Sequence, residues 1–215
     1  IGDYVRFAAS QFNQTELFFG HGSDNAWHEA ITLVMHVLAL PETLIEQVFT
    51  TKLTQDERVA VLAIIELRLD SGAPAAYLTN QAMFAGLPFY VDERVLVPRS
   101  PIGELIENKF SGLVDKEPKR ILDLCTGSGC IAIACASYFP DAEVDAVDLS
   151  TDALDVAQIN IESHGLSHQV VPIESDGYGA LSGFQYDLIV SNPPYVDQED
   201  VDNLPQEFLH EPAMG

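Results

Sequence analysis

The chain has 215 residues, of which 10 are Lys or Arg and 33 are Asp or Glu, so its formal charge at pH 7 is −23, and 47% of its residues are apolar. That apolar fraction excludes a disordered acidic tail and suffices for one large domain or two small ones. No apolar run approaches the roughly 18 residues of a membrane-spanning helix, and the first ten residues lack the features of a secretory signal, so we expect a cytoplasmic protein.

The first third of the chain shows apolar residues at helical spacing. One helix is predicted to start near Ser23 or Asp24, a shorter one follows, and a third opens on a capping box formed by Thr54 and Glu57. No cluster of chemically reactive side chains interrupts these helices. We therefore expect residues 1–80 to form a small helical domain.

A change of composition follows at residues 81–100. Aromatic and β-branched residues surround the turn-forming residues 86–88 and 92–93, which predicts a β-hairpin linker. A helix over residues 102–112 then opens the second domain, which we place at residues 101–215.

Beyond residue 120 the pattern alternates between strands and helices. Buried strands are predicted at residues 121–124, 144–147, 170–173 and 186–190, and helices at 128–138 and 151–164. Such alternation is typical of an α/β domain with a mostly parallel sheet and right-handed crossovers. Three cysteines and six histidines show no metal-ligand spacing, so we expect no bound metal.

A glycine-rich turn follows the first of these strands in the sequence DLCTGSG. In parallel α/β sheets, ligands bind at the carboxyl ends of the strands, and Gly127 and Gly129 allow the backbone to approach a ligand closely. Asp148 ends the next strand, where its carboxylate can accept hydrogen bonds from ribose hydroxyls. The spacing predicts a nucleoside site, although a glycine-rich turn without a ligand and an NAD site share this pattern.

Two carboxylates bear on which nucleoside is bound. Asp123 stands four residues before the first glycine, where it can lie near a methionine ammonium, and no catalytic His or Lys of a nicotinamide site is recognisable. S-adenosylmethionine is therefore favoured over NAD. Asp176 follows the third strand and is a candidate contact to the adenine amino group, or alternatively a helix or turn cap.

The most specific motif is NPPY, which follows the fourth strand. The side-chain oxygen of Asn192 and the carbonyl of Pro193 can each accept one hydrogen of a substrate NH2 group, so that the nitrogen lone pair points at the methyl group. Pro193 and Pro194 stiffen the backbone, and Tyr195 offers a flat face for a planar amide or base. These residues are the predicted catalytic and substrate-binding site.

With these motifs the chain resembles the HemK, PrmC and PrmB protein-glutamine methyltransferases, and the PrmB type in particular, over about residues 25–215. VLVPRSPI and the later HEP sequence are similar to PrmB. The resemblance implies a Rossmann-like class I methyltransferase core, a helical domain that holds the substrate protein, and N(5)-methylation of a glutamine in the third protein of the large ribosomal subunit. It also implies that the family fold continues beyond Gly215, so that the core is incomplete here.

The resemblance further implies individual contacts. The expected cofactor contacts are Cys125, Thr126, Gly127, Ser128, Gly129, Asp148 and Asn192, and the segment from Asn192 to Tyr195 is expected to hold the glutamine side chain. Two positions depart from the family pattern. Cys125 stands where related enzymes often have glycine, and Gly177 stands where the release-factor enzymes have an aromatic residue, so that Tyr178 can take its place.

Charge distribution bears on the partner. All ten basic residues lie at or before Arg120, and the 95 residues from Ile121 onward contain 17 acidic ones. A basic ribosomal protein suits this charge, direct nucleic-acid binding is not expected, and a surface adapted for solubility gives the same count. Alternatives to this ribosomal protein as substrate are an adenine N6 or other nucleic-acid amino group, a release factor, and a non-catalytic assembly role.

Overall fold

The computed structural model describes residues 1–15, 17–20, 22–23, 25–193 and 210–212. The chain divides into two compact units, the first built on Ile1–Asn80 and the second beginning at Gln81, with Glu211 belonging to the second. Among the described residues, no single helix is long and apolar enough to cross a membrane. One bent pair, Ala26–Val37 with Glu42–Val48, meets that criterion by length and composition together.

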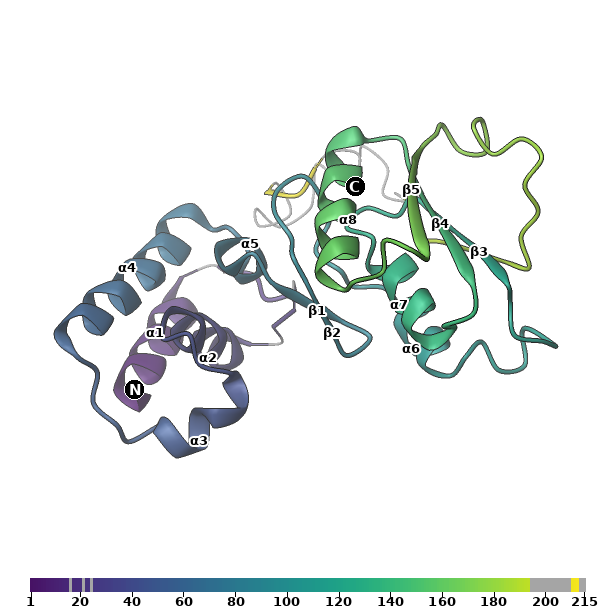
Figure 1. Ribbon diagram of the computed structural model, residues 1–215. Coiled ribbons are helices and arrows are strands. Elements are labelled where there is room, and N and C mark those ends of the chain that lie inside the picture. The colour runs from purple at the N-terminus through teal and green to yellow at the C-terminus, as the bar shows by residue number, and fades with distance from the viewer. Residues whose placement is uncertain (16, 21, 24, 194–209, 213–215) are drawn as a thin grey trace. The chain divides into compact units, whose positions relative to one another are not determined.

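The first unit is helical (Figure 1). Its elements are α1 (Gly2–Gln14), α2 (Ala26–Val37), the 3-10 helix η1 (Glu42–Leu44), α3 (Ile45–Val48), α4 (Gln55–Ser71) and α5 (Ala75–Thr79). Helix α1 buries Val5, Ala8 and Phe12, which recur at helical spacing and pack with Leu33 of α2 and Ile65 of α4 in one core. Helices α1 and α5 were not anticipated from the sequence.

Two helices of this unit, α2 and α4, begin at side-chain caps. The Thr54 hydroxyl accepts from the Glu57 N–H at 3.4 Å and the Glu57 carboxylate accepts from the Thr54 N–H at 2.7 Å, which confirms the predicted capping box of α4. The helix predicted to start near Ser23 or Asp24 is α2, which begins at Ala26. Asn25 caps it, because its side-chain oxygen accepts from the two N–H groups of Trp27 and His28, each at 3.0 Å.

The second unit opens with a short antiparallel hairpin of β1 (Ala82–Phe84) and β2 (Leu87–Phe89). Its turn is Ala85-Gly86, both with positive φ, as a two-residue hairpin turn of type I′ requires. The prediction that Leu87 and Pro88 belong to the turn was therefore wrong, since they pair within β2. The next helix, α6 (Ile102–Glu107), ends five residues before the predicted end at Gly112.

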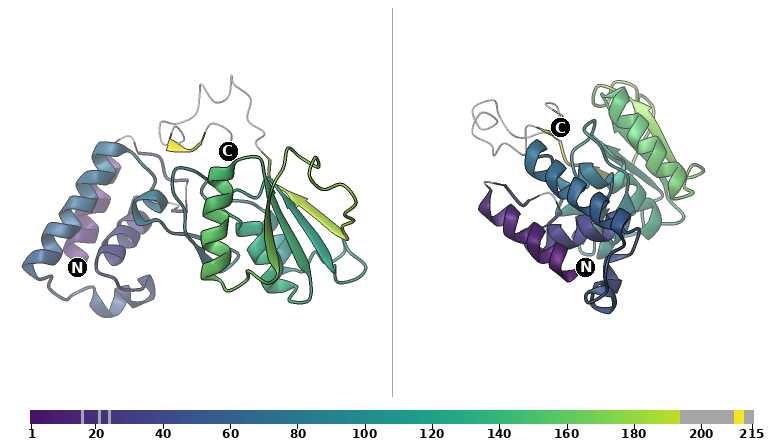
Figure 2. Two further views of the ribbon diagram at one scale, coloured as in Figure 1. Left: turned by 45° about the horizontal axis from the view of Figure 1, so that its top comes forward. Right: turned by 90° about the vertical axis from the view of Figure 1, so that its left-hand side faces the viewer.

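A parallel sheet forms the centre of this unit (Figure 2). Its described strands are β3 (Arg120–Leu124), β4 (Glu143–Asp148), β5 (Val170–Glu174) and β6 (Leu188–Ser191), in the order β5-β4-β3-β6, with α7 (Cys130–Tyr138) and α8 (Thr151–Ser163) between them in the chain. The predicted α/β parallel sheet is confirmed. Its last strand begins two residues later than predicted.

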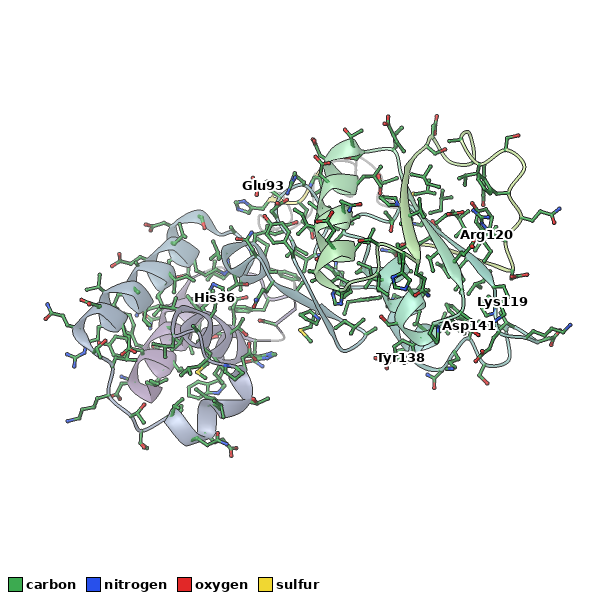
Figure 3. All side chains as sticks on the ribbon, in the orientation of Figure 1. His36, Glu93, Lys119, Arg120, Tyr138 and Asp141 are labelled. Atoms are coloured by element: carbon green, nitrogen blue, oxygen red, sulfur yellow. The ribbon has the colours of Figure 1, made fainter. Side chains whose placement is uncertain are left out.

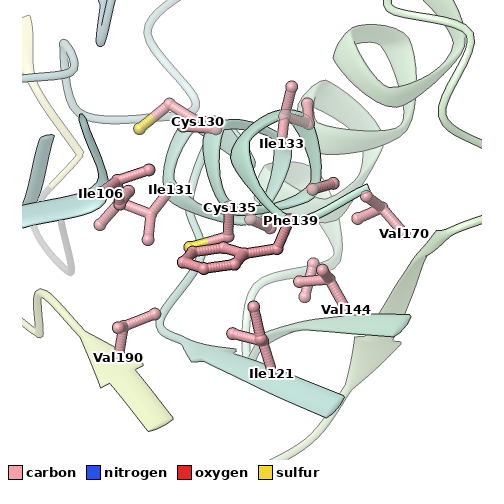
Figure 4. Close-up of a cluster of buried hydrophobic side chains, with 14 of the residues drawn as sticks. Ile106, Ile121, Cys130, Ile131, Ile133, Cys135, Phe139, Val144, Val170 and Val190 are labelled. Carbon is pink, nitrogen blue, oxygen red and sulfur yellow. The ribbon is translucent and has the colours of Figure 1, made fainter. Parts of the chain in front are cut away.

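Alternation along the strands decides which side chains face the helices. Ile121, Val144 and Val190 belong to the core with α7, as Figure 4 shows, whereas Leu122 and Val147 lie in a second, smaller cluster with Leu181. Helix α7 is buried along most of its length, which explains why its sequence is apolar without a polar face.

Two basic residues, Lys119 and Arg120, lie at the amino-terminal edge of the sheet. The Arg120 guanidinium donates to Asp145 at 2.8 Å and lies over the ring of Phe184, and Lys119 pairs with Asp141 at 3.2 Å (Figure 3). The hydrogen bond to Asp145 raises the pKa of Arg120. Both basic side chains therefore have partners at the amino-terminal edge. The glycine-rich turn and NPPY follow the strands at the opposite, carboxyl edge.

Candidate active site

Strand register brings the predicted site residues to one edge of the sheet. Leu124 is paired with Val147 on one side and with Ser191 on the other, so the residues that follow, Cys125, Asp148 and Asn192, end three neighbouring strands at the same level. The carboxyl edge of a parallel sheet is where ligands bind in this class of fold. The glycine-rich turn and the start of NPPY are therefore neighbours.

Two glycines of the turn serve different purposes. Both have positive φ, 54° at Gly127 and 78° at Gly129. A Cβ atom at Gly129 would lie 3.2 Å from the Ala157 Cβ, so this glycine permits α7 and α8 to pack closely. A Cβ at Gly127 would meet no described heavy atom within 4 Å, which leaves open space for a ligand above the backbone.

Asp148 fixes this turn through both carboxylate oxygens. One accepts from the Gly127 N–H at 2.9 Å and the other accepts from the Ser150 N–H at 3.0 Å. The side chain is half-buried, and each oxygen keeps a further acceptor position. Asp148 can therefore hold the turn and still accept from two vicinal hydroxyls.

Asp123 is fully buried beneath the turn. One of its oxygens accepts from the Thr126 hydroxyl at 2.5 Å and from the Ala132 N–H at 3.1 Å, while the other has no hydrogen-bond partner among the described residues. Burial raises the pKa of Asp123 to about 7, and the negative charge of Asp148 acts in the same direction. Contact between Asp123 and a cofactor stays a prediction, since the contacts seen hold Thr126 and the start of α7 in place.

Cys125 occupies an unusual backbone position. Its φ is 62°, in the left-handed region that favours glycine, and its half-buried thiol has a pKa raised by burial. The Ser191 hydroxyl donates to the Leu124 carbonyl at 2.7 Å, which ties the ends of β3 and β6 together beside it. The other two thiols, Cys130 and Cys135, are buried and free.

NPPY is described in part. Asn192 directly follows β6 and is half-buried, and Pro193 is exposed. Both therefore stand next to the glycine-rich turn with access to solvent. Pro194 and Tyr195 lie outside the described residues.

The residue predicted to contact adenine follows the end of β5. Glu174 pairs in register with Asp148 and is exposed, and Asp176 is exposed two residues later. Sequence reasoning named Asp176 and missed Glu174, whose place opposite Asp148 follows only from the register. The contact of Asp176 with adenine stays a prediction.

Sequence reasoning also missed Asn160, which is fully buried on α8. Its side-chain amide donates to the carbonyls of Tyr90 and Ser128, each at 2.9 Å, and its oxygen accepts from the Tyr90 N–H at 2.7 Å. Asn160 thus joins the glycine-rich turn to the segment after the hairpin. The available signal was a polar residue next to Ile161, on the apolar face of an amphipathic helix.

A second connection joins two distant segments of the same unit. The Glu211 carboxylate accepts from the Arg99 guanidinium at 2.7 and 2.5 Å and from the Val97 N–H at 3.2 Å. Arg99 comes from the VLVPR sequence and Glu211 from the HEP sequence. Glu211 is thereby anchored to the segment that precedes α6.

Comparison with known proteins identifies what this site resembles. Residues 109–214 match the family model described as methyltransferase small domain. The ribosomal protein uL3 glutamine methyltransferase of Neisseria gonorrhoeae is 52% identical over the whole of this chain and 72% of its own length, and that of Neisseria meningitidis is 51% identical over 71% of its length. Among solved structures, the tRNA m1G37 methyltransferase of M. jannaschii is 24% identical over 57% of this chain and 37% of its own, with a TM-score of 0.42.

Proposed function

We infer the function from a family relationship, because this chain belongs to the ribosomal protein uL3 glutamine methyltransferases. It is a protein-glutamine methyltransferase with an α/β class I methyltransferase core, and it transfers a methyl group to the side-chain amide of a glutamine in uL3. The observation that most directly supports this chemistry is the pairing of Leu124 with Ser191, which sets Asn192 beside the glycine-rich turn.

We propose S-adenosylmethionine as the methyl donor. The open space above Gly127 and the remaining acceptor positions of Asp148 fit a nucleoside with two ribose hydroxyls. Exposed carboxylates at Glu174 and Asp176 suit an adenine amino group. When bound, this donor supplies a methyl group on a positively charged sulfur, which is an electrophile.

The chain's own residues must then activate a weak nucleophile. An amide nitrogen shares its lone pair with the carbonyl, so it attacks poorly unless the lone pair is localised. The Asn192 side-chain oxygen and the Pro193 carbonyl oxygen each accept one hydrogen of the glutamine NH2, which orients the lone pair at the methyl group. As the new N–C bond forms, the bond between the methyl group and sulfur breaks and its electron pair stays on sulfur. The methylated nitrogen is then acidic and loses one proton through Asn192 or water.

Pro194 and Tyr195 complete the proposed substrate site. The consecutive prolines restrict the backbone so that the accepting carbonyl keeps its direction. Tyr195 provides an aromatic face against which the planar amide stacks. An adenine amino group could use the same two acceptors, so the test of the substrate includes DNA.

The second unit suits a basic partner. From Ile121 onward the chain has 17 acidic residues and no Lys or Arg, so a basic ribosomal protein is attracted to it. We propose that residues 1–80 form the part of the chain that holds the substrate protein, with residues 81–100 as linker. We also propose that the enzyme acts in the cytoplasm, because its substrate is a ribosomal protein.

Labelled methyl donor tests the substrate. The enzyme is incubated with methyl-labelled S-adenosylmethionine and, separately, uL3, a release factor or adenine-containing DNA, and the labelled residue is found by fragment mass spectrometry. We expect label on a uL3 glutamine. Label in DNA alone would replace the proposal with the nucleic-acid alternative, and label in the release factor alone would reassign the protein substrate.

Cofactor choice has its own test. A ligand that binds only the folded state raises the apparent melting temperature. We expect S-adenosylmethionine to raise it and NAD to leave it unchanged. The reverse result would contradict the proposed donor.

A further inference from the structure

A hollow of about 690 Å³ lies on the helical unit, away in the sequence from every residue assigned to methyl transfer. It is formed by the start of α1, the first turn of α2, the connection between α3 and α4, and the first turn of α4. Its lining includes three basic and two aromatic residues, Arg6, Lys52, Arg58, Trp27 and Phe49.

The charge of this hollow is opposite to that of the unit around it. Residues 1–80 contain four basic residues against ten acidic ones. Three of the four basic residues line the hollow, with Asp3 as the acidic side chain among them, while the fourth, Arg68, is buried against Glu29 at 2.6 Å. The exposed cations of an acidic unit are thus gathered at one place.

Aromatic side chains accompany these cations. Trp27 is 45% exposed and its ring centroid lies 6.3 Å from that of Phe49, which is 36% exposed. The Arg58 guanidinium donates twice to the Leu53 carbonyl, at 3.1 and 3.0 Å, which fixes its position at the hollow. Both rings therefore present part of their surface at the hollow.

We propose that this hollow binds single-stranded RNA. Cations that follow a phosphate backbone, interleaved with aromatic rings on which bases stack, are the two elements of single-strand binding. An acidic peptide would use the cations but not the rings, and a basic peptide would be repelled. The proposal differs from the expectation, drawn from net charge, that this chain does not bind nucleic acid.

The sequence itself supplies the probe, since Trp27 is its only tryptophan. Intrinsic tryptophan fluorescence is recorded during titration with a single-stranded RNA dodecamer. We expect saturable quenching. With three phosphate contacts the logarithm of the affinity should fall with a slope of about −2 against the logarithm of salt, or about 16-fold between 50 and 200 mM.

Two variants of the hollow and one control variant test the phosphate contacts. Lys52→Ala and Arg6→Ala should each weaken binding severalfold and reduce the slope to about −1.4, whereas Lys116→Ala, an exposed lysine of the other unit, should change neither. Circular dichroism and melting temperature confirm that each variant is folded.

Three results would overturn the proposal: no quenching at low salt, quenching unaffected by Lys52→Ala and Arg6→Ala, or equal quenching by a glutamate decapeptide. The last result would identify an acidic-peptide site. Fluorescence quenching by RNA and transfer of labelled methyl are separate readouts, so loss of RNA binding and loss of methylation can be told apart in the same preparations.

Discussion

Asp123 is a carboxyl group without contact with water, and its ionisation is coupled to folding. Burial raises its pKa to about 7 in the folded state, whereas an Asp in an unfolded chain titrates near about 3.9. The folded state therefore binds this proton more tightly. The free energy of unfolding contributed by Asp123 should decrease as pH rises from about 4 to about 7, and stay constant above that range.

Asp123→Asn removes this titration. Chemical denaturation across the same range should show the wild type losing free energy of unfolding relative to the variant, by up to about 4 kcal/mol for three pKa units. Asp152→Asn, at an exposed position of α8, should show no such trend. A wild-type to Asp123→Asn difference that is independent of pH would contradict the assignment.

Cys125 has a backbone conformation that costs about 1–2 kcal/mol for a residue with a side chain. Cys125→Ala keeps that strain and removes the thiol, whereas Cys125→Gly removes both. We expect the glycine variant to be about 1 kcal/mol more stable than the alanine variant by thermal denaturation. This order is the reverse of the usual one, so an alanine variant of equal or greater stability would show that the turn is unstrained.

Prediction from the sequence succeeded for residues whose position does not depend on the side chains that contact them. Gly127 and the carboxylate of Asp148 lie together because the carboxyl ends of parallel strands share one edge of the sheet, and their contacts with a cofactor stay a prediction. Asp123 could be placed beneath the turn, but its orientation away from solvent depends on the Thr126 hydroxyl and the Ala132 N–H. Neither contact is visible in a linear pattern.

At the scale of elements, Asn160 couples α8 to both the glycine-rich turn and the chain after the hairpin. Removing a buried hydrogen-bond partner leaves the remaining group unsatisfied, at about 1–3 kcal/mol each. Asn160→Ala should therefore lower the free energy of unfolding. Asn160→Asp should lower it further, because a carboxylate would face the carbonyls of Tyr90 and Ser128.

Gln158→Ala is the matched control, since Gln158 lies on the same helix and its side-chain amide donates to Glu162 on the surface. Its effect should stay within about 0.5 kcal/mol. Should Asn160→Asp be as stable as Asn160→Ala, the donor role of the side-chain amide would be wrong.

Secondary structure was predictable where two signals agreed. α4 has apolar periodicity together with a capping box, and the parallel strands are apolar runs bounded by turns. Helix α1 was missed because small and polar residues separate its apolar residues Val5, Ala8 and Phe12. These three form a buried stripe only because they pack against α2. The hairpin turn was misplaced because Pro88 suggested a turn, although a proline is compatible with a strand that has an unpaired edge.

At the scale of the whole molecule, charge should control encounter with the protein substrate. The acidic second unit attracts a basic protein through interactions that salt screens over about 8–10 Å. The KM for uL3 should therefore rise severalfold between about 50 and 300 mM salt while kcat stays constant. A short uncharged glutamine peptide should show no rise, and a salt-independent KM for uL3 would exclude electrostatic attraction.

Methyl transfer by the residues at the carboxyl edge of the sheet is tested most directly at Asn192. The rate of labelled methyl transfer to uL3 and the affinity for S-adenosylmethionine are measured for the wild type, Asn192→Ala and the exposed control Asn108→Ala. Loss of a preorganised hydrogen-bond acceptor should lower kcat by about 10²–10³ in Asn192→Ala, with cofactor affinity within severalfold of wild type and the control unchanged. An Asn192→Ala enzyme with wild-type kcat would contradict the mechanism.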